Sequence, residues 1–84
     1  MNNTQPDAMI LLAQLEREAR AADSGKSGIT TFFYDQVRAE IGAGGRVWFR
    51  VNNGPRLYQA RAIETLDRIE ASEKHRAELI AQGS

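Results

Sequence analysis

Residues 46–60 read RVWFRVNNGPRLYQA, and this stretch decides the expected fold. Val47, Phe49 and Val51 alternate with other residues, which is the period-two pattern of a strand with one buried face. The Asn-Gly pair that follows suits the positive φ angles of a tight reversal. We therefore predict a β-hairpin over residues 46–60.

The register of this hairpin depends on the length of its loop. A three-residue loop sets Phe49 opposite Leu57 and Trp48 opposite Tyr58, whereas a loop of two or four residues sets Phe49 opposite Tyr58. In either register one face is apolar, and the other presents Trp48 flanked by arginines with no acidic residue in the hairpin. The prediction is a ribbon with one apolar face and one basic-aromatic face.

The N-terminal part of the chain is expected to hold one amphipathic helix. Apolar residues recur at three- and four-residue steps over about residues 7–22, and Pro6 with Asp7 suits a first turn. Residues 1–6 are assigned to a flexible N-terminus. The run DSGKSG at 23–28 contains two glycines and no apolar side chain, so it is predicted to be a loop.

Residues 29–41 allow two interpretations. Phe33, Val37 and Ile41 repeat every four residues, and the glycine run that follows would end a helix. The β-branched and aromatic residues at 29–34 instead suit a strand that joins the hairpin as a third member. We favour the helix and keep the strand as the alternative.

The chain after the hairpin is predicted to form a C-terminal helix over residues 61–81. Apolar residues at three-residue steps from Ile63 to Ile69 mark its buried face. The pattern then thins until Leu79 and Ile80. The far end is therefore expected to project, and these two side chains are the candidate oligomer contact.

Together these elements predict a single small α+β domain over residues 1–84, of order ααββα, with helices packed on a two-stranded antiparallel hairpin. A chain of 84 residues buries only a modest share of its surface. Self-association or docking to a partner would therefore help to stabilise it.

Composition narrows the class of function. Lys+Arg and Asp+Glu balance at 11 each, so the bulk charge exerts no long-range attraction on nucleic acid. There is no cysteine, and His75 has no second ligand spaced to help it hold a metal. The carboxylates lie mainly on predicted helix faces beside basic neighbours, which suits a solvated surface better than an acid-base pair. We expect no catalytic residue, no cofactor and no metal site, and therefore no enzyme.

The expected location is the cytoplasm, without a membrane contact. The N-terminus lacks the basic segment and long apolar core of an export signal. The apolar cluster from Met9 to Leu12 is far shorter than the roughly 20 residues that span a bilayer.

The basic-aromatic face of the hairpin is the candidate binding surface. Trp, Tyr and Arg dominate interface hot spots, and guanidinium groups also pair with phosphates. In a purely structural interpretation of this face, the aliphatic stems of the arginines cover a half-exposed indole and bind no partner. We favour a protein partner over nucleic acid. The candidate partner-binding residues are Arg46, Trp48, Arg50, Arg56 and Tyr58.

The order of helix, basic hairpin and helix resembles the small phage head-tail joining proteins of the gpW type, which are αββα modules. The matching region runs from about Phe32 to Leu79 and includes VWFRV at 47–51 with the Asn-Gly turn after it. The resemblance implies a structural protein that assembles as a ring on a portal, in the host cytoplasm or the virion. It would contact DNA or neighbouring subunits through its hairpin. The resemblance implies Arg46, Arg50 and Arg56 as the contact residues.

These features of the sequence suit three functions. The favoured one is a non-enzymatic binding or assembly module that forms a homo-oligomer, with phage head-tail joining as the example. The first alternative is a small phage-borne inhibitor or adaptor that masks a host protein. The second alternative is a nucleic-acid-binding protein, whose affinity would fall steeply with salt.

Overall fold

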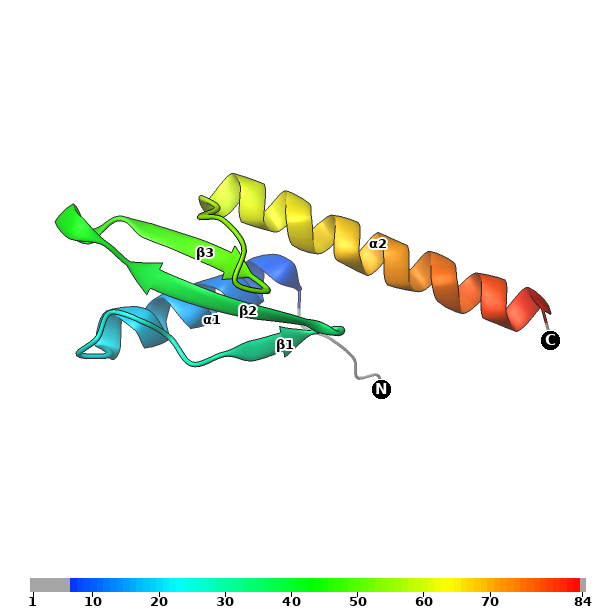
Figure 1. Cartoon of the computed structure of the whole chain (residues 1–84), viewed down its shortest axis with the longest axis horizontal. Helices are drawn as coiled ribbons and strands as arrows, with labels where there is room; N and C mark the ends of the chain where they lie inside the picture. The colour runs from blue at the N-terminus through cyan, green and yellow to red at the C-terminus, as the bar shows by residue number, and fades with distance from the viewer. Residues whose placement is uncertain (1–6, 84) are drawn as a thin grey trace.

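The computed structural model describes the backbone of residues 7–83 and the side chains of residues 7–80, so the flexible N-terminus predicted for residues 1–6 lies outside the described residues. The elements in chain order are α1 (Ala8–Ala21), β1 (Thr30–Phe32), β2 (Asp35–Ile41), the short 3-10 helix η1 (Ala43–Gly45), β3 (Val47–Val51) and α2 (Gln59–Gly83). The strands form an antiparallel sheet in the order β1-β2-β3. Figure 1 shows α2 running past the sheet and away from it.

The α+β class is confirmed, but the order ααββα is wrong. The segment expected to be a helix over residues 29–41 forms β1, a tight turn and β2 instead. Val37 and Ala39 are buried while Gln36 is exposed, so this segment buries its apolar residues with period two. The alternative of a strand within residues 29–34 is nearer to the structure, although β1 pairs with β2.

The predicted hairpin is only partly formed. Its turn lies at the expected place, with positive φ at Asn52 and Asn53. Its second arm is reduced to a single bridge between Phe49 and Leu57, which is the register of the three-residue loop. Because α2 already begins at Gln59, no room remains for a full second strand, and β2 becomes the strand partner of β3.

The helices expected over residues 7–22 and 61–81 are confirmed as α1 and α2, with bounds that differ by two residues or fewer. The expected loop at 23–28 connects α1 to β1. Within it, Lys26 forms an isolated bridge to Glu40 of β2.

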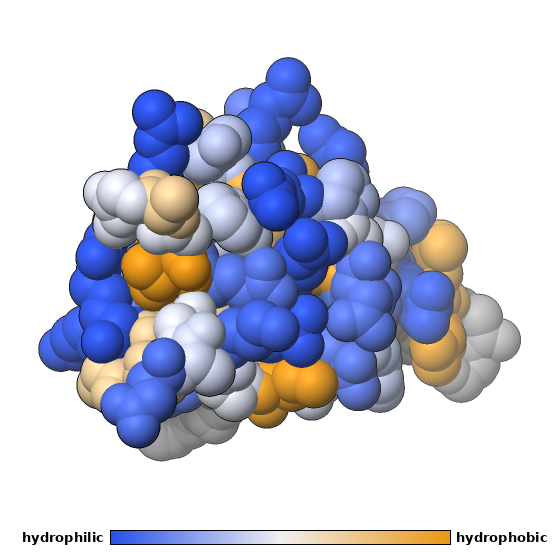
Figure 2. All heavy atoms as spheres, turned by 60° about the vertical axis from the view of Figure 1, so that its left-hand side comes forward, coloured by the Kyte–Doolittle hydropathy of each residue, from blue (hydrophilic) through white to orange (hydrophobic). Residues whose placement is uncertain are grey.

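The core lies between the two helices and one face of the sheet. Its buried apolar side chains come from both helices and all three strands: Ala8, Leu11, Leu12, Leu15, Ala19, Phe32, Val37, Ala39, Phe49, Ala62 and Leu66. Because Val37, Ala39 and Phe49 point into this core, the alternation of a strand turns Glu40 and Trp48 to the opposite face. Figure 2 brings the β2–β3 end forward and shows mainly hydrophilic side chains, with apolar atoms in small separate patches.

The buried hydroxyl of Ser27 is the hydrogen-bond partner of a backbone N–H of β2. We expect Ser27→Ala to lower the free energy of unfolding by about 1–3 kcal/mol. The buried Ser27 hydroxyl accepts a hydrogen bond from the Ala39 N–H (2.9 Å) and donates one to the Gly28 carbonyl (3.0 Å). Without the hydroxyl, a buried N–H loses its partner. Urea unfolding measures the loss, with the exposed Ser24→Ala as the control. Equal stability of the two variants would contradict this role of Ser27.

Candidate functional site

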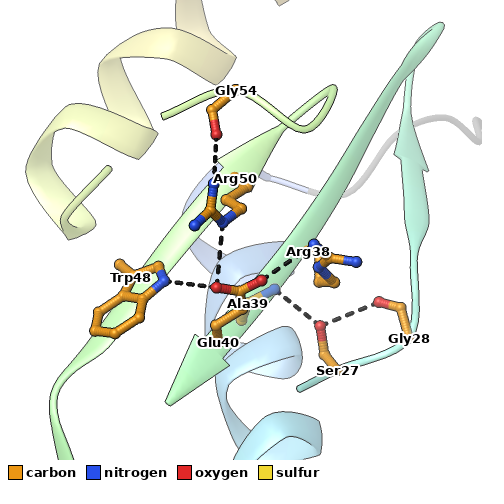
Figure 3. A network of polar contacts seen from close by, with 8 residues as sticks. All are labelled: Ser27, Gly28, Arg38, Ala39, Glu40, Trp48, Arg50 and Gly54. Atoms are coloured by element: carbon orange, nitrogen blue, oxygen red, sulfur yellow. Dashed lines mark hydrogen bonds and ion pairs between the residues drawn. The ribbon is translucent and has the colours of Figure 1, made fainter. Parts of the chain in front are cut away.

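The face of the sheet turned away from the helices carries the candidate site. We call it the arginine face and define it by Arg38, Glu40, Trp48, Arg50 and Arg56. Across β2 and β3, Arg38 lies directly opposite Arg50, and Glu40 directly opposite Trp48. Figure 3 shows these four side chains on one side of the two strands, with α1 behind them.

Glu40 connects the members of this face. One of its carboxylate oxygens accepts hydrogen bonds from Trp48 Nε1 (2.7 Å) and Arg50 Nε (3.1 Å), and the other oxygen pairs with Arg38 Nη2 (3.1 Å). The residue is only 8% exposed. A buried carboxylate is thus held by three donors, two of them cationic.

This environment changes the acidity of Glu40. Burial raises the pKa of the carboxyl, but the hydrogen bonds from Trp48 and Arg50 and the charges of Arg50 and Arg38 outweigh it. The net pKa therefore lies below the ordinary value of 4.5. Glu40 stays ionised at neutral pH, so the ion pairs persist there.

We expect this pKa to make folding sensitive to acid. Because the folded pKa is lower than the unfolded one, the contribution of Glu40 is present above the unfolded value and is lost as the pH falls through the folded value. Urea unfolding of the native chain and of Glu40→Gln, from about pH 7 to about pH 3, measures this contribution. The stability difference between the two proteins should shrink in acid. A difference that is constant with pH would contradict the lowered pKa.

Trp48 is held between an arginine and a glycine. The Arg56 guanidinium carbon lies 4.1 Å from the centroid of the indole ring. Gly42 lies against the six-membered ring, since a Cβ added there would come within 2.1 Å of Trp48 Cη2. The half-buried indole therefore fixes Arg56 and Glu40 in place and offers little free ring surface.

Positive charge exceeds negative charge on the arginine face. The side chains of Arg38 and Arg50 are 27% and 28% exposed, and they share the carboxylate of Glu40. Arg50 also donates from Nη1 to the Gly54 carbonyl (2.9 Å), whereas the buried Nε of Arg38 has no hydrogen-bond partner among residues 7–80. Among the side chains that the structure describes, this face therefore holds three guanidinium groups: Arg38 and Arg50 pair with the carboxylate of Glu40, and Arg56 packs on Trp48.

The predicted site residues are only partly brought together. Trp48, Arg50 and Arg56 share the arginine face, as expected from the sequence. Arg46 is exposed just before β3, and Tyr58 is 55% exposed just before α2, and neither is linked to Glu40 by a hydrogen bond or ion pair in residues 7–80.

The predicted oligomer contact lies on a different part of the molecule. Leu79 is 55% exposed and Ile80 is 66% exposed. Both are on the end of α2 that extends beyond the sheet (Figure 1). The arginine face and this helix end are therefore separate surfaces.

Two members of the arginine face were missed from the sequence. Arg38 and Glu40 belong to a segment that was expected to be helical, and Glu40 supplies the acidic group that the hairpin itself lacks. The signal was present as alternation, since polar residues at 36, 38 and 40 alternate with apolar residues at 37, 39 and 41. A strand over these positions would have placed both residues opposite β3.

The described residues provide neither a metal-binding cluster nor a helix that could span a membrane. Among the residues that the structure describes, no group of three or more His, Cys, Asp or Glu side chains could hold a metal ion. Neither helix, within residues 7–83, combines the length and apolar character needed to cross a bilayer. No protein-family model, curated protein or solved structure matches the chain. The proposal for its function therefore rests on the geometry of the arginine face.

Proposed function

We propose that this chain is a non-enzymatic binding module that takes part in assembly, and that the arginine face binds its partner. The observation that carries the proposal is a buried carboxylate paired with two guanidinium groups, beside a third guanidinium group that packs on Trp48, on a sheet face that neither helix covers. Side chains fixed in advance lose less entropy on binding. Arginine and tryptophan are also enriched among the residues that dominate binding energy at interfaces.

The far half of α2 is the proposed contact between copies. The partly buried hydrophobic residues packed against the core reach only as far as Ile69 along this helix. Beyond it, Leu79 is exposed, and an open groove of about 470 Å³ lies between the β1–β2 turn and α2, lined by Phe33, Tyr34, Glu73, Lys74 and Ala77. Short helices without packing partners are marginally stable in water, so a second copy would stabilise this half. Head-tail joining, which the sequence resemblance implies, is one function that such a self-associating module would serve.

Light scattering of the full chain over a range of concentrations tests the assembly role. We expect a particle mass above that of the monomer at high concentration, and a shift toward the monomer for Leu79→Glu, because a charge at this contact must be desolvated. Ala60→Glu, exposed in the first turn of α2, is the matched control and should associate like the native chain. A strictly monomeric native chain would contradict assembly and favour the inhibitor or adaptor alternative.

A further inference from the structure

We infer that the arginine face recognises a carboxylate-bearing segment of a protein partner, such as a run of Asp or Glu residues. This inference rests on the proposed function, because it names the chemistry of the partner that the same face would bind.

The arginine face carries positive charge that its own carboxylate does not balance. Arg38 and Arg50 occupy directly opposite positions on β2 and β3, where like charges repel. Glu40 supplies one negative charge for both, and Arg56 adds a third guanidinium group over the ring of Trp48, whose N–H donates to Glu40. The net charge of the whole chain is zero, so this excess is local. A carboxylate from a partner would supply the missing counter-charge.

The guanidinium groups of this face also have N–H donors that no contact within residues 7–80 uses. A guanidinium group carries five N–H donors in a planar fork, and this fork binds carboxylates with two parallel hydrogen bonds. Arg38 contacts Glu40 through Nη2, and Arg50 contacts Glu40 and Gly54. Arg56 donates no hydrogen bond to a side chain or backbone group in residues 7–80 and packs on Trp48. Several N–H groups therefore remain for a ligand, on side chains whose stems are already fixed.

The arginine face suits a protein partner better than a nucleic acid. Proteins that bind single-stranded nucleic acid combine a basic groove with aromatic rings on which bases stack. The ring of Trp48 is already covered by Arg56 and lies against Gly42. Tyr58 is exposed, but no ring contact or hydrogen bond within residues 7–80 joins it to Trp48 or Glu40. The arginine face offers charge and hydrogen bonds without a stacking platform, which fits an acidic peptide better.

Titration with a deca-glutamate peptide tests the inference. Trp48 is the only tryptophan in the chain, so its indole N–H gives a single NMR signal from the middle of the arginine face. In the isotope-labelled full chain we expect this signal to shift and saturate as peptide is added. Removing one charged fork in Arg56→Gln should weaken binding about tenfold. Arg68→Gln, an exposed arginine on α2, is the matched control and should bind like the native chain.

Three outcomes would overturn the inference. The first is no shift of the Trp48 signal at millimolar peptide, and the second is an equal response to deca-lysine. The third is tighter binding of an oligo-thymidine of similar length, which would indicate a nucleic-acid partner instead. If the peptide fails to bind while the chain still self-associates, the inference is rejected and the assembly role stands. Peptide binding by a strictly monomeric chain supports the inference and rejects the assembly role.

Discussion

Glu40→Ala should lower the free energy of unfolding by about 3 kcal/mol, measured by urea denaturation at neutral pH. The substitution leaves Trp48 Nε1 without its acceptor and removes the carboxylate that Arg38 and Arg50 share. Breaking a buried ion pair on one side is costly because the remaining charge stays poorly solvated. Both guanidinium groups are more than a quarter exposed, so water compensates part of the loss. The expected value is therefore at the low end for such pairs.

The control for this prediction is Glu16→Ala. Glu16 also pairs with an arginine, Arg20, at 3.0 Å, but the arginine side chain is 47% exposed. Exposed pairs of this kind contribute little, so a change within about 0.5 kcal/mol is expected. If Glu40→Ala were as mild as Glu16→Ala, Glu40 would not organise the arginine face.

Gly42→Ala should cost about 3 kcal/mol and change the fluorescence of Trp48. The new Cβ would lie 2.1 Å from Trp48 Cη2 and 2.3 Å from Cζ3, distances at which one group must move. The backbone of Gly42, with φ −104°, lies in the extended region that any residue adopts, so the cost comes from the side-chain clash alone. The indole must shift, and its hydrogen bond to Glu40 is then strained or broken.

Gly28→Ala provides the matched control. A Cβ at Gly28 meets no atom within 4 Å, and the residue is exposed, so stability should stay within about 0.5 kcal/mol of the native value. Urea unfolding and the emission of Trp48 in the folded state check both variants. Native stability and unchanged emission in Gly42→Ala would show that the indole does not pack against this glycine.

The elements with strong local signals were predictable from the sequence. Both helices carry apolar residues at helical spacing over many positions, and the turn after β3 uses positive φ angles at Asn52 and Asn53, residues that tolerate them. β2 was mistaken for a helix because Val37 and Ile41 are four residues apart, and four is a step of both the helical and the strand pattern. The choice between the two depends on β3, which needs a long-range strand partner that local sequence does not reveal.

The candidate site was predictable only where its residues are neighbours within one strand. Trp48 and Arg50 share a face because they alternate within one strand, and this relation is local. Arg38 and Glu40 join them only through the register of β2 with β3, which follows from tertiary pairing. Arg46 was placed on the same face by its alternation with Trp48, but β3 begins only at Val47. Tyr58 was placed there by assuming a complete hairpin, whose second arm is reduced to one bridge.

The stability of Arg38→Gln tests most directly the central claim that the arginine face holds more positive charge than its own fold requires. The substitution removes a like charge opposite Arg50 and the Nε group that lacks a partner, while Glu40 keeps Arg50 and Trp48. We therefore expect the free energy of unfolding, measured in urea, to stay within about 0.5 kcal/mol of the native value or to rise above it. A loss of more than about 2 kcal/mol would contradict the claim, because Arg38 would then serve the fold as the partner of Glu40.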